Sequence, residues 1–243
     1  MKKPPPRRLF RCPIATFILG TLSRSLSGYR GVDRLRTLTC QRLRNCRVEK
    51  LGIGEVSLSN REIKTISSRE VYRNKWTRVR EDVIERANGE RGIYGVIDKD
   101  PACIIIPIDA TPDGDFIYLV EQFRYTVGAR FMELPQGGWE IANVNPEEMA
   151  RGELREETGL TAERMTLLST LQIGYGVMNQ KQHVYLAEGL THGEHDRDAE
   201  EADLEVHRLG VAEFESMLLD GRIVDNCSAA AWGLYRLWCD RRS

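Results

Sequence analysis

The chain has 243 residues, of which 41% are hydrophobic and 29% charged, and its length allows one large domain or a domain with appendages. Its formal net charge of −1 is unevenly spread, because residues 1–48 hold twelve Lys or Arg and one acid, leaving a net −12 on the other 195 residues. A folded part this acidic argues against a nucleic-acid-binding surface, and it needs a metal ion to bridge it to a polyanionic ligand.

The basic leader, residues 1–48, is rich in Pro and Arg and contains an apolar run from Ile14 to Leu22. It resembles a signal peptide, but no small-residue cleavage site follows, and the run is too short to span a bilayer as a helix. An organellar transit peptide, a disordered tail and a misassigned start remain alternatives. We expect the folded domain over residues 49–243.

Strand signals dominate the first half of this domain. Thr77–Arg86 and a segment around Ile93–Val96 flank Asn88-Gly89, a strong hairpin signal, so a β-hairpin region is expected at about 60–97. The continuous apolar run Cys103–Ile108 predicts a strand buried on both faces. A turn at 111–115 then leads into a strand over Phe116–Glu121.

An acidic helix is predicted to follow. Asn145 suits the N-cap position and Pro146 the first helical position, while Thr158-Gly159 supplies the end. Glu153, Glu156 and Glu157 then share one helix face, since positions i, i+3 and i+4 are neighbours. Such carboxylates repel one another, and they suit Mg²⁺ or Mn²⁺ as hard oxygen ligands; a charged surface helix is the simpler alternative.

The segment Gly138–Leu160, GWEIANVNPEEMARGELREETGL, is similar to the Nudix box, G-x5-E-x7-R-E-U-x-E-E-x-G-U, over its whole length without gaps. Two positions depart from this pattern. Val144 replaces a Glu and Gly152 replaces an Arg, two residues that commonly form a structural salt bridge in the family. The metal-binding half is intact, and nearby charged residues are candidates to compensate: Glu147, Glu148 and Arg151.

A second motif indicates which subgroup of the family the chain resembles. The stretches Glu121–Tyr125 (EQFRY) and Glu133–Gly138 (ELPQGG) are similar to those of ADP-ribose and ADP-sugar pyrophosphatases, and the likeness covers residues 70–238. It implies an α/β fold, a Nudix α/β/α sandwich with a mixed β-sheet. The implied activity is hydrolysis of the pyrophosphate bond in a nucleoside diphosphate linked to a sugar, giving a nucleoside monophosphate and a sugar phosphate.

Other readings stay open. Another Nudix substrate, such as GDP-mannose, a nucleoside triphosphate or capped RNA, is one alternative, and a non-catalytic nucleotide-binding sensor is another. The resemblance implies a Mg²⁺ cofactor, with Mn²⁺ as a substitute. Glu153, Glu157 and the carbonyl group of Gly137 are the implied metal ligands, and Glu156 a further ligand or a residue that orients the attacking water.

The general base is expected in the acidic loop 194–203, where Glu201 is the first candidate and Glu200 the second. Arg124 is the expected phosphate contact, because its planar guanidinium suits bidentate binding. Tyr175, in a glycine-rich loop, is a candidate for substrate binding. Trp76 and Trp139 are candidates for stacking on a nucleobase, with ordinary packing as the simpler interpretation.

The rest of the chain predicts strands near 165–172, 183–188 and 204–208 and helices over 211–220 and 226–239. His183 and His207 are expected in strands and His192 and His195 in loops, without zinc spacing. No C-x-x-C pair occurs, which favours free thiols and a reducing, cytoplasmic location, with organellar import as the alternative. Related enzymes are often homodimers with crossed N-terminal strands, and residues 60–97 are the candidates here.

Overall fold

The structure is a computed structural model that describes residues 62–138, 144–193 and 203–242. Several predictions concern positions outside these ranges: the leader 1–48, Trp139, His195, Glu200 and Glu201. Within the described ranges, no helix combines the length and the apolar character needed to cross a membrane.

The first three strands form an antiparallel sheet of their own: β1 (Ile63–Arg73), β2 (Arg78–Arg86) and β3 (Arg91–Asp98). The predicted turn between β2 and β3 is confirmed, and Gly89 adopts a φ of 81°, a conformation that glycine reaches without a steric cost. Strand β1 was not predicted individually. All of its residues are exposed, so it shows no alternation of buried and exposed positions.

The second sheet is mixed and has the order β10-β5-β4-β9-β8, with β6 paired to β5 and β7 to β4. Its central pair, β4 (Ala102–Thr111) and β9 (Lys181–His192), is parallel, whereas the other pairs are antiparallel. The remaining strands are β5 (Gly114–Arg124), β6 (Ala129–Glu133), β7 (Gln136–Gly137), β8 (Leu160–Gln172) and β10 (Glu205–Gly210). His192 was predicted in a loop; this is wrong, because the pairing with β8 continues to the end of β9.

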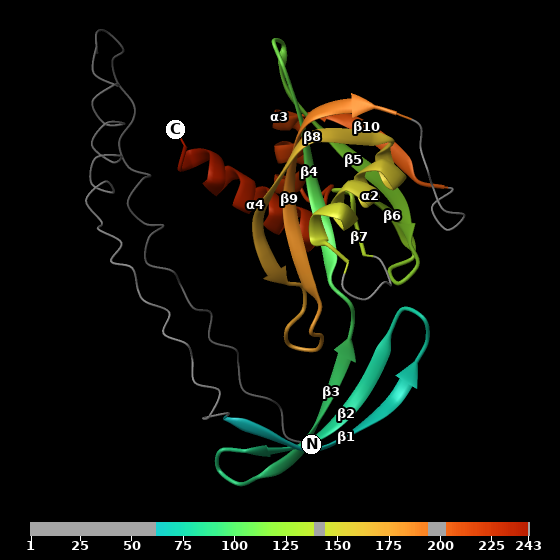
Figure 1. Cartoon of the computed structure of the whole chain (residues 1–243), viewed down its shortest axis with the longest axis vertical. Helices are drawn as coiled ribbons and strands as arrows, with labels where there is room; N and C mark the ends of the chain where they lie inside the picture. The colour runs from blue at the N-terminus through green and yellow to red at the C-terminus, as the bar shows by residue number, and fades with distance from the viewer. Residues whose placement is uncertain (1–61, 139–143, 194–202, 243) are drawn as a thin grey trace, which may run out of the picture. The chain divides into compact units, whose positions relative to one another are not determined.

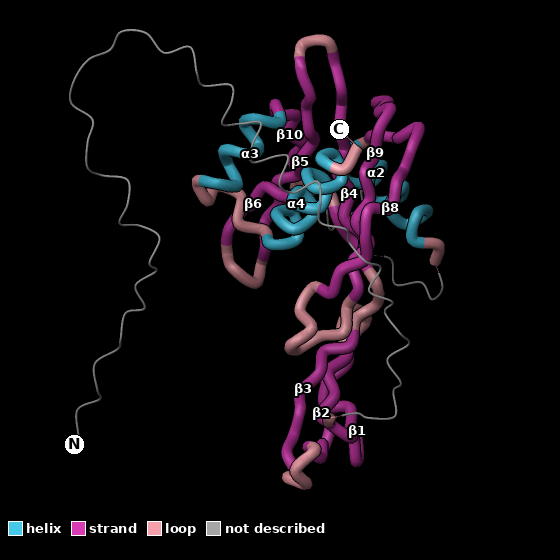
Figure 2. Tube along the Cα trace, turned by 90° about the vertical axis from the view of Figure 1, so that its left-hand side faces the viewer, coloured by secondary structure: helices cyan, strands magenta, loops and turns pink. Residues whose placement is uncertain are grey.

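Helices cover both faces of this sheet: α2 (Pro146–Thr158) one face, and α3 (Val211–Leu219) and α4 (Asn226–Asp240) the other (Figures 1 and 2). Because side chains alternate along a strand, Cys103 and Ile105 of β4 face the cluster that includes Leu154 of α2. Ile104 and Ile106 face the opposite cluster with Phe214 and Trp232. This alternation confirms both the α/β/α sandwich and the strand buried on two faces.

Helix α2 begins and ends where the sequence predicts. The Asn145 side chain accepts a hydrogen bond of 2.9 Å from the backbone N–H of Glu147, which satisfies one of the free donors at the helix start. Gly159 ends the helix in the left-handed conformation, with a φ of 71°. These two caps fix where the helix begins and ends, and the helical period places Glu153 and Glu157 on one face.

Candidate functional site

Two carboxylates of α2 lie directly against the short strand β7. Oε2 of Glu157 accepts a hydrogen bond of 2.9 Å from the backbone N–H of Gln136. The Glu153 carboxylate lies over Gly137 so closely that a Cβ atom there would be 2.6 Å from Cδ and 2.8 Å from Oε1 of Glu153. Only glycine leaves this space. The glycine loop and the acidic helix therefore form one constellation, as their proximity in the sequence predicts.

The same two side chains are almost fully buried, with 5% of Glu153 and 2% of Glu157 exposed. Two like charges buried side by side require a compensating cation or specific donors. Carboxylate oxygens are the donors that Mg²⁺ and Mn²⁺ prefer. The two buried carboxylates of Glu153 and Glu157 thus fit a divalent cation, and the half-buried Glu156 precedes Glu157 on the helix.

Cys103 of β4 pairs with Gly137 across the two strands, so its thiol lies close to the two carboxylates. Burial raises the pKa of its thiol, and the negative charges of Glu153 and Glu157 raise it further. The thiol therefore stays protonated at neutral pH and is not a nucleophile. Its place in the site is explained by packing.

The two departures from the box pattern lie around this helix. Val144 packs against the apolar cluster under α2, so an aliphatic contact replaces one end of the usual ion pair. Gly152 is buried in the helix. Arg151 donates to Glu147 Oε1 at 2.9 Å and to the carbonyl oxygen of Ala162 at 2.8 Å, which ties α2 to β8. Of the compensating residues proposed from the sequence, the structure joins Arg151 and Glu147.

A cavity of about 250 Å³ adjoins the glycine loop. Its lining includes Gln136, Gly137, Arg124, Lys99 and Trp76. Arg124 and Lys99 bring positive charge to this lining. Trp76 is 49% exposed, and Nζ of Lys75 lies 3.9 Å from the centroid of its ring. The carboxylates of Glu153 and Glu157 are not among the described lining residues, but both contact the Gln136–Gly137 strand that lines the cavity. Cations and an aromatic ring in one cavity suit a diphosphate attached to a planar group.

Arg124 is held in place by the buried carboxylate of Glu133. Nε of Arg124 donates to Glu133 Oε2 at 3.3 Å, and the two side chains form an ion pair. Burial raises the pKa of Glu133, and the Arg124 charge acts in the opposite direction. The same Oε2 accepts a hydrogen bond of 3.1 Å from the Gln136 side chain, which also donates to Asp225 at 3.1 Å.

Sequence reasoning missed this polar network around Arg124. Glu133 and Gln136 belong to the ELPQGG motif, but the sequence indicated no structural or catalytic role for either residue. Asp225 lies 89 residues from Gln136 in the chain, and the only local signal for it is its place as N-cap of α4.

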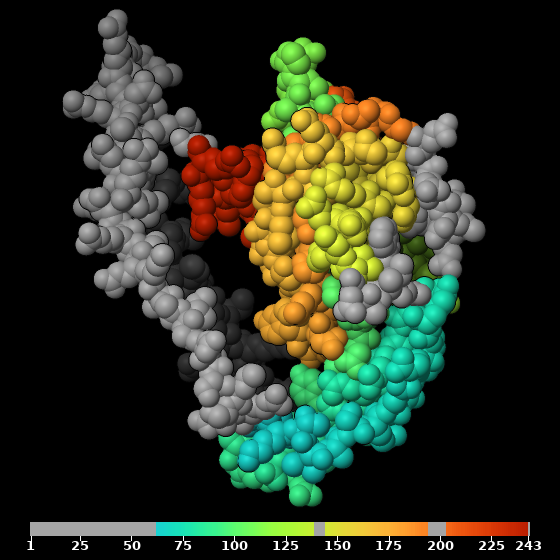
Figure 3. All heavy atoms as spheres, in the orientation of Figure 1, coloured from blue at the N-terminus to red at the C-terminus, as the bar shows by residue number. Residues whose placement is uncertain are grey.

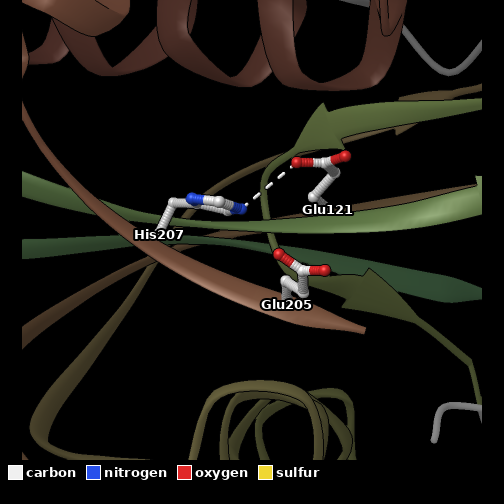
Figure 4. Close-up of side chains that lie close together, drawn as sticks. All are labelled: Glu121, Glu205 and His207. Carbon is white, nitrogen blue, oxygen red and sulfur yellow. Dashed lines mark ion pairs between the residues drawn. The ribbon is translucent and has the colours of Figure 1, made fainter. Parts of the chain in front are cut away.

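A separate group of potential metal ligands lies on the other side of the sheet (Figure 4). It consists of Glu121, Glu205 and His207, whose ligand atoms lie within 4.8 Å of one another. Glu121 shares a strand face with Leu119, which packs in the cluster under α3 and α4, so this group faces away from α2. Arg130 already forms ion pairs with Glu121 at 3.2 Å and with Glu205 at 3.8 Å, so a guanidinium balances these carboxylates.

The other predicted residues are distributed differently. Tyr175 lies between β8 and β9 with 85% of its surface exposed and is not among the residues lining the cavity described above. It stays a prediction. The candidate bases Glu200 and Glu201 lie outside the described residues. His183 and His207 are strand residues, as predicted. Figure 3 shows that α2, in yellow, forms part of the molecular surface.

Comparisons with known proteins match both the N-terminal sheet and the domain that follows it. The NUDIX domain profile matches residues 99–225, and the nucleoside diphosphate sugar hydrolase N-terminal domain matches residues 63–97. An ADP-ribose pyrophosphatase of Mycobacterium tuberculosis is 32% identical over 174 residues, which cover 71% of this chain and 83% of that protein. An ADP-ribose pyrophosphatase of Bacillus subtilis is 31% identical over 140 residues, covering 58% and 74%.

A third relative carries a different name. The methanol dehydrogenase activator of Bacillus methanolicus is 26% identical over 171 residues, covering 70% of this chain and 90% of that protein. A crystal structure of an ADP compounds hydrolase superposes with a TM-score of 0.65 at 22% identity and covers 77% of this chain and 99% of its own. At that identity the likeness shows the fold alone.

Proposed function

The chain belongs to the Nudix family of hydrolases, and from this premise we propose that it hydrolyses the pyrophosphate bond of ADP-sugars, with ADP-ribose as the preferred substrate. The observation that carries the proposal is the contact of Glu153 and Glu157 with the Gln136–Gly137 strand beside the cavity that holds Arg124 and Trp76. The two ADP-ribose pyrophosphatases at 31–32% identity support the choice of sugar nucleotide.

Nudix hydrolases depend on a divalent metal, and we propose Mg²⁺, with Mn²⁺ as a substitute. When bound, the ion neutralises phosphate oxygens and lowers the pKa of a coordinated water. Glu153, Glu157 and the Gly137 carbonyl group are the proposed ligands, and Glu156 is proposed as a further ligand or as the residue that orients the water.

The other steps belong to the chain's own residues. Arg124 binds a phosphate oxygen through its planar guanidinium, which Glu133 holds in the cavity. Trp76 stacks on the adenine ring, and Tyr175 contacts the substrate from the β8–β9 turn. Glu201, or Glu200, removes the proton from the attacking water as general base. The products are AMP and ribose 5-phosphate.

We also propose that the chain acts as a homodimer. The sheet β1–β3 exposes a group of large apolar side chains, each at least 40% exposed: Ile63, Ile66, Val71, Tyr72, Ile93 and Tyr94. Apolar side chains gathered on one small sheet mark an interaction surface more often than scattered ones do. Light scattering after size exclusion tests this, and a monomer at micromolar concentration would contradict it.

A cytoplasmic location is proposed for the same protein, with organellar import through the basic leader as the alternative. The described cysteines, Cys103, Cys227 and Cys239, are free thiols, which suits a reducing compartment. Fractionation of cells that express the full chain distinguishes the two.

The activity is tested with the full chain and Mg²⁺ on ADP-ribose, ADP-glucose, GDP-mannose and a nucleoside triphosphate, with products separated by chromatography. We expect AMP and ribose 5-phosphate from ADP-ribose, lost on addition of EDTA and restored by Mg²⁺. Nucleotide binding without hydrolysis of any compound would overturn the proposal in favour of a sensor.

A further inference from the structure

The stretch Leu134-Pro135-Gln136, where β6 leads into β7, forms hydrogen bonds to both helical layers. On the α2 side, the backbone N–H of Gln136 donates to Glu157 at 2.9 Å. On the opposite side, the backbone N–H of Leu134 donates to Oγ of Ser228 in α4 at 2.8 Å. The carbonyl oxygen of Pro135 accepts from the backbone N–H of Ile105 in β4 at 2.9 Å.

Asp225 is the centre of the bonds on the α4 side. Its Oδ2 accepts from the backbone N–H of Ser228 at 2.8 Å, from Oγ of Ser228 at 2.7 Å and from Nε2 of Gln136 at 3.1 Å. Its Oδ1 accepts from the backbone N–H of Cys227 at 3.3 Å. Asp225 therefore caps α4 and holds the Gln136 side chain with the same carboxylate.

The Gln136 side chain has little freedom left. Nε2 donates one hydrogen to Asp225 and the other to Glu133 at 3.1 Å, and Oε1 accepts from the buried Gln182 at 3.1 Å. Both donor positions of the amide are used, so its orientation is fixed. Since Glu133 also holds Arg124, one network connects Asp225 with the phosphate-binding arginine and with the strand that faces Glu153 and Glu157.

Helix α4 is itself fixed by the core. Trp232 packs edge-on against Phe214 with ring centroids 5.0 Å apart, and Ala231 and Trp232 are buried. A carboxylate at the N-cap of a helix anchored in this way has a defined position, and the N-terminal end of the helix dipole favours its charge. Hydrogen bonds from Gln136 to Asp225 and from Leu134 to Ser228 therefore tie the β6–β7 segment to this fixed helix end.

We propose that Asp225 is a positioning residue for hydrolysis, which fixes the Gln136–Gly137 backbone and thereby the arrangement of Glu157 and Arg124 from the helical layer opposite α2. The inference rests on the proposed function, since it concerns the same centre. Residues that orient metal ligands from behind typically change metal affinity or activity by about 10- to 100-fold when they are replaced.

The test uses Asp225→Ser in the full chain. Serine is a good N-cap, so α4 keeps its start, but the shorter side chain does not reach Gln136. Asp220→Ser is the matched control, because Asp220 is half exposed and pairs only with Arg222 among the ion pairs of the described residues. Each change is also made in a Gln136→Ala background, which gives a double-mutant cycle.

Two quantities are measured besides the melting temperature: KM for ADP-ribose, and the affinity for Mn²⁺ from the electron paramagnetic resonance signal of the free ion. We expect Asp225→Ser to raise KM and to lower the Mn²⁺ affinity by about tenfold each. In the Gln136→Ala background, the same substitution should change either quantity by less than about twofold. Asp220→Ser is expected to change neither. A lower melting temperature with unchanged KM and Mn²⁺ affinity would reduce Asp225 to a helix cap and overturn the inference.

Equal effects of Asp225→Ser in the two backgrounds would overturn it as well, because the effect would not pass through Gln136. The Mn²⁺ measurement needs no substrate, so it separates this inference from the proposed function. If the unmodified chain cleaves no ADP-sugar but Asp225→Ser still weakens Mn²⁺ binding through Gln136, the substrate proposal fails and the positioning role stands.

Discussion

Oε2 of Glu157 accepts a hydrogen bond of 2.9 Å from the backbone N–H of Gln136, 21 residues earlier in the chain. The backbone of the glycine loop thereby orients one carboxylate oxygen of Glu157. The bond explains how a side chain with only 2% of its surface exposed keeps a defined orientation in a site that must also hold a second carboxylate, Glu153.

Replacement of Glu157 by Gln is expected to abolish most turnover. Glutamine can still accept the bond from Gln136, but it lacks the charge that a metal ligand supplies, so kcat should fall by about 100-fold or more. Substrate binding, measured with a non-hydrolysable analogue, should change far less. The exposed Glu163→Gln on β8 is the control and should keep full activity. An active Glu157→Gln enzyme would show that the metal is held elsewhere.

Gly137→Ala tests the close approach of Glu153. The added Cβ would be 2.6 Å from Cδ of Glu153, so the carboxylate must shift, at a cost of about 1–3 kcal/mol in the free energy of unfolding. The Mg²⁺ concentration needed for half-maximal activity should rise. Gly233→Ala on α4 is the matched control, because its Cβ meets nothing within 4 Å and it should stabilise the helix by up to about 1 kcal/mol. Thermal melts and Mg²⁺ titrations check both variants. If Gly137→Ala and Gly233→Ala had the same melting temperature and the same Mg²⁺ dependence, the steric argument would be contradicted.

The sequence predicted the parts of this site that depend on local signals. The caps at Asn145 and Gly159, and the spacing of Glu153 and Glu157, lie within one short segment, so helical periodicity alone places the carboxylates on one face. The run Cys103–Ile108 predicted the central strand because apolar residues on both faces leave a continuous pattern.

The missed parts depend on contacts between distant segments. Asp225 and Gln136 are 89 residues apart, and no periodicity or spacing connects them. Strand β1 was missed for a different reason: every one of its residues is exposed, so the alternation that reveals a half-buried strand is absent. The pairing of β1 with β2 follows from backbone hydrogen bonds, which the side-chain pattern does not encode.

Arg124→Ala should lower stability in a pH-dependent way. It leaves Glu133, which is 3% exposed, without its cation, at a cost of about 2–3 kcal/mol; the Arg124 side chain is 40% exposed, so the cost is less than for a fully buried pair. Burial already raises the pKa of Glu133, and loss of Arg124 raises it further. A raised carboxyl pKa favours folding below the unfolded pKa, and this contribution is lost as pH rises through the folded pKa. The stability deficit should therefore be largest at neutral pH and shrink as the solution is acidified.

The double variant Arg124→Ala/Glu133→Gln separates stability from substrate binding. Because it removes the buried charge, it should recover most of the melting temperature at neutral pH while KM stays high. Chemical denaturation at several pH values, together with initial rates, checks this. A deficit independent of pH would mean that Glu133 is not the group left uncompensated.

Trp76→Ala is expected to weaken binding of the nucleoside part of the substrate. Base stacking on an aromatic ring contributes about 1–3 kcal/mol, so KM for ADP-ribose should rise by about tenfold or more, with kcat little changed. Trp76→Phe should recover part of the loss, since it keeps a ring. Inhibition by AMP should weaken in parallel with KM, whereas inhibition by inorganic pyrophosphate should not. Equal losses for both inhibitors would assign Trp76 to packing.

His207→Ala and Glu205→Gln should leave the metal dependence of hydrolysis unchanged. Their group with Glu121 has the side chains of a metal site, but it faces the layer of α3 and α4, and Arg130 already pairs with both carboxylates. The activity should retain its Mg²⁺ requirement within about twofold, while Glu157→Gln loses most turnover. A Mg²⁺ titration of each variant decides the matter. If His207→Ala shifts the requirement as strongly as a change on α2 does, the catalytic ion is coupled to the opposite face, and the ligand assignment to Glu153 and Glu157 fails.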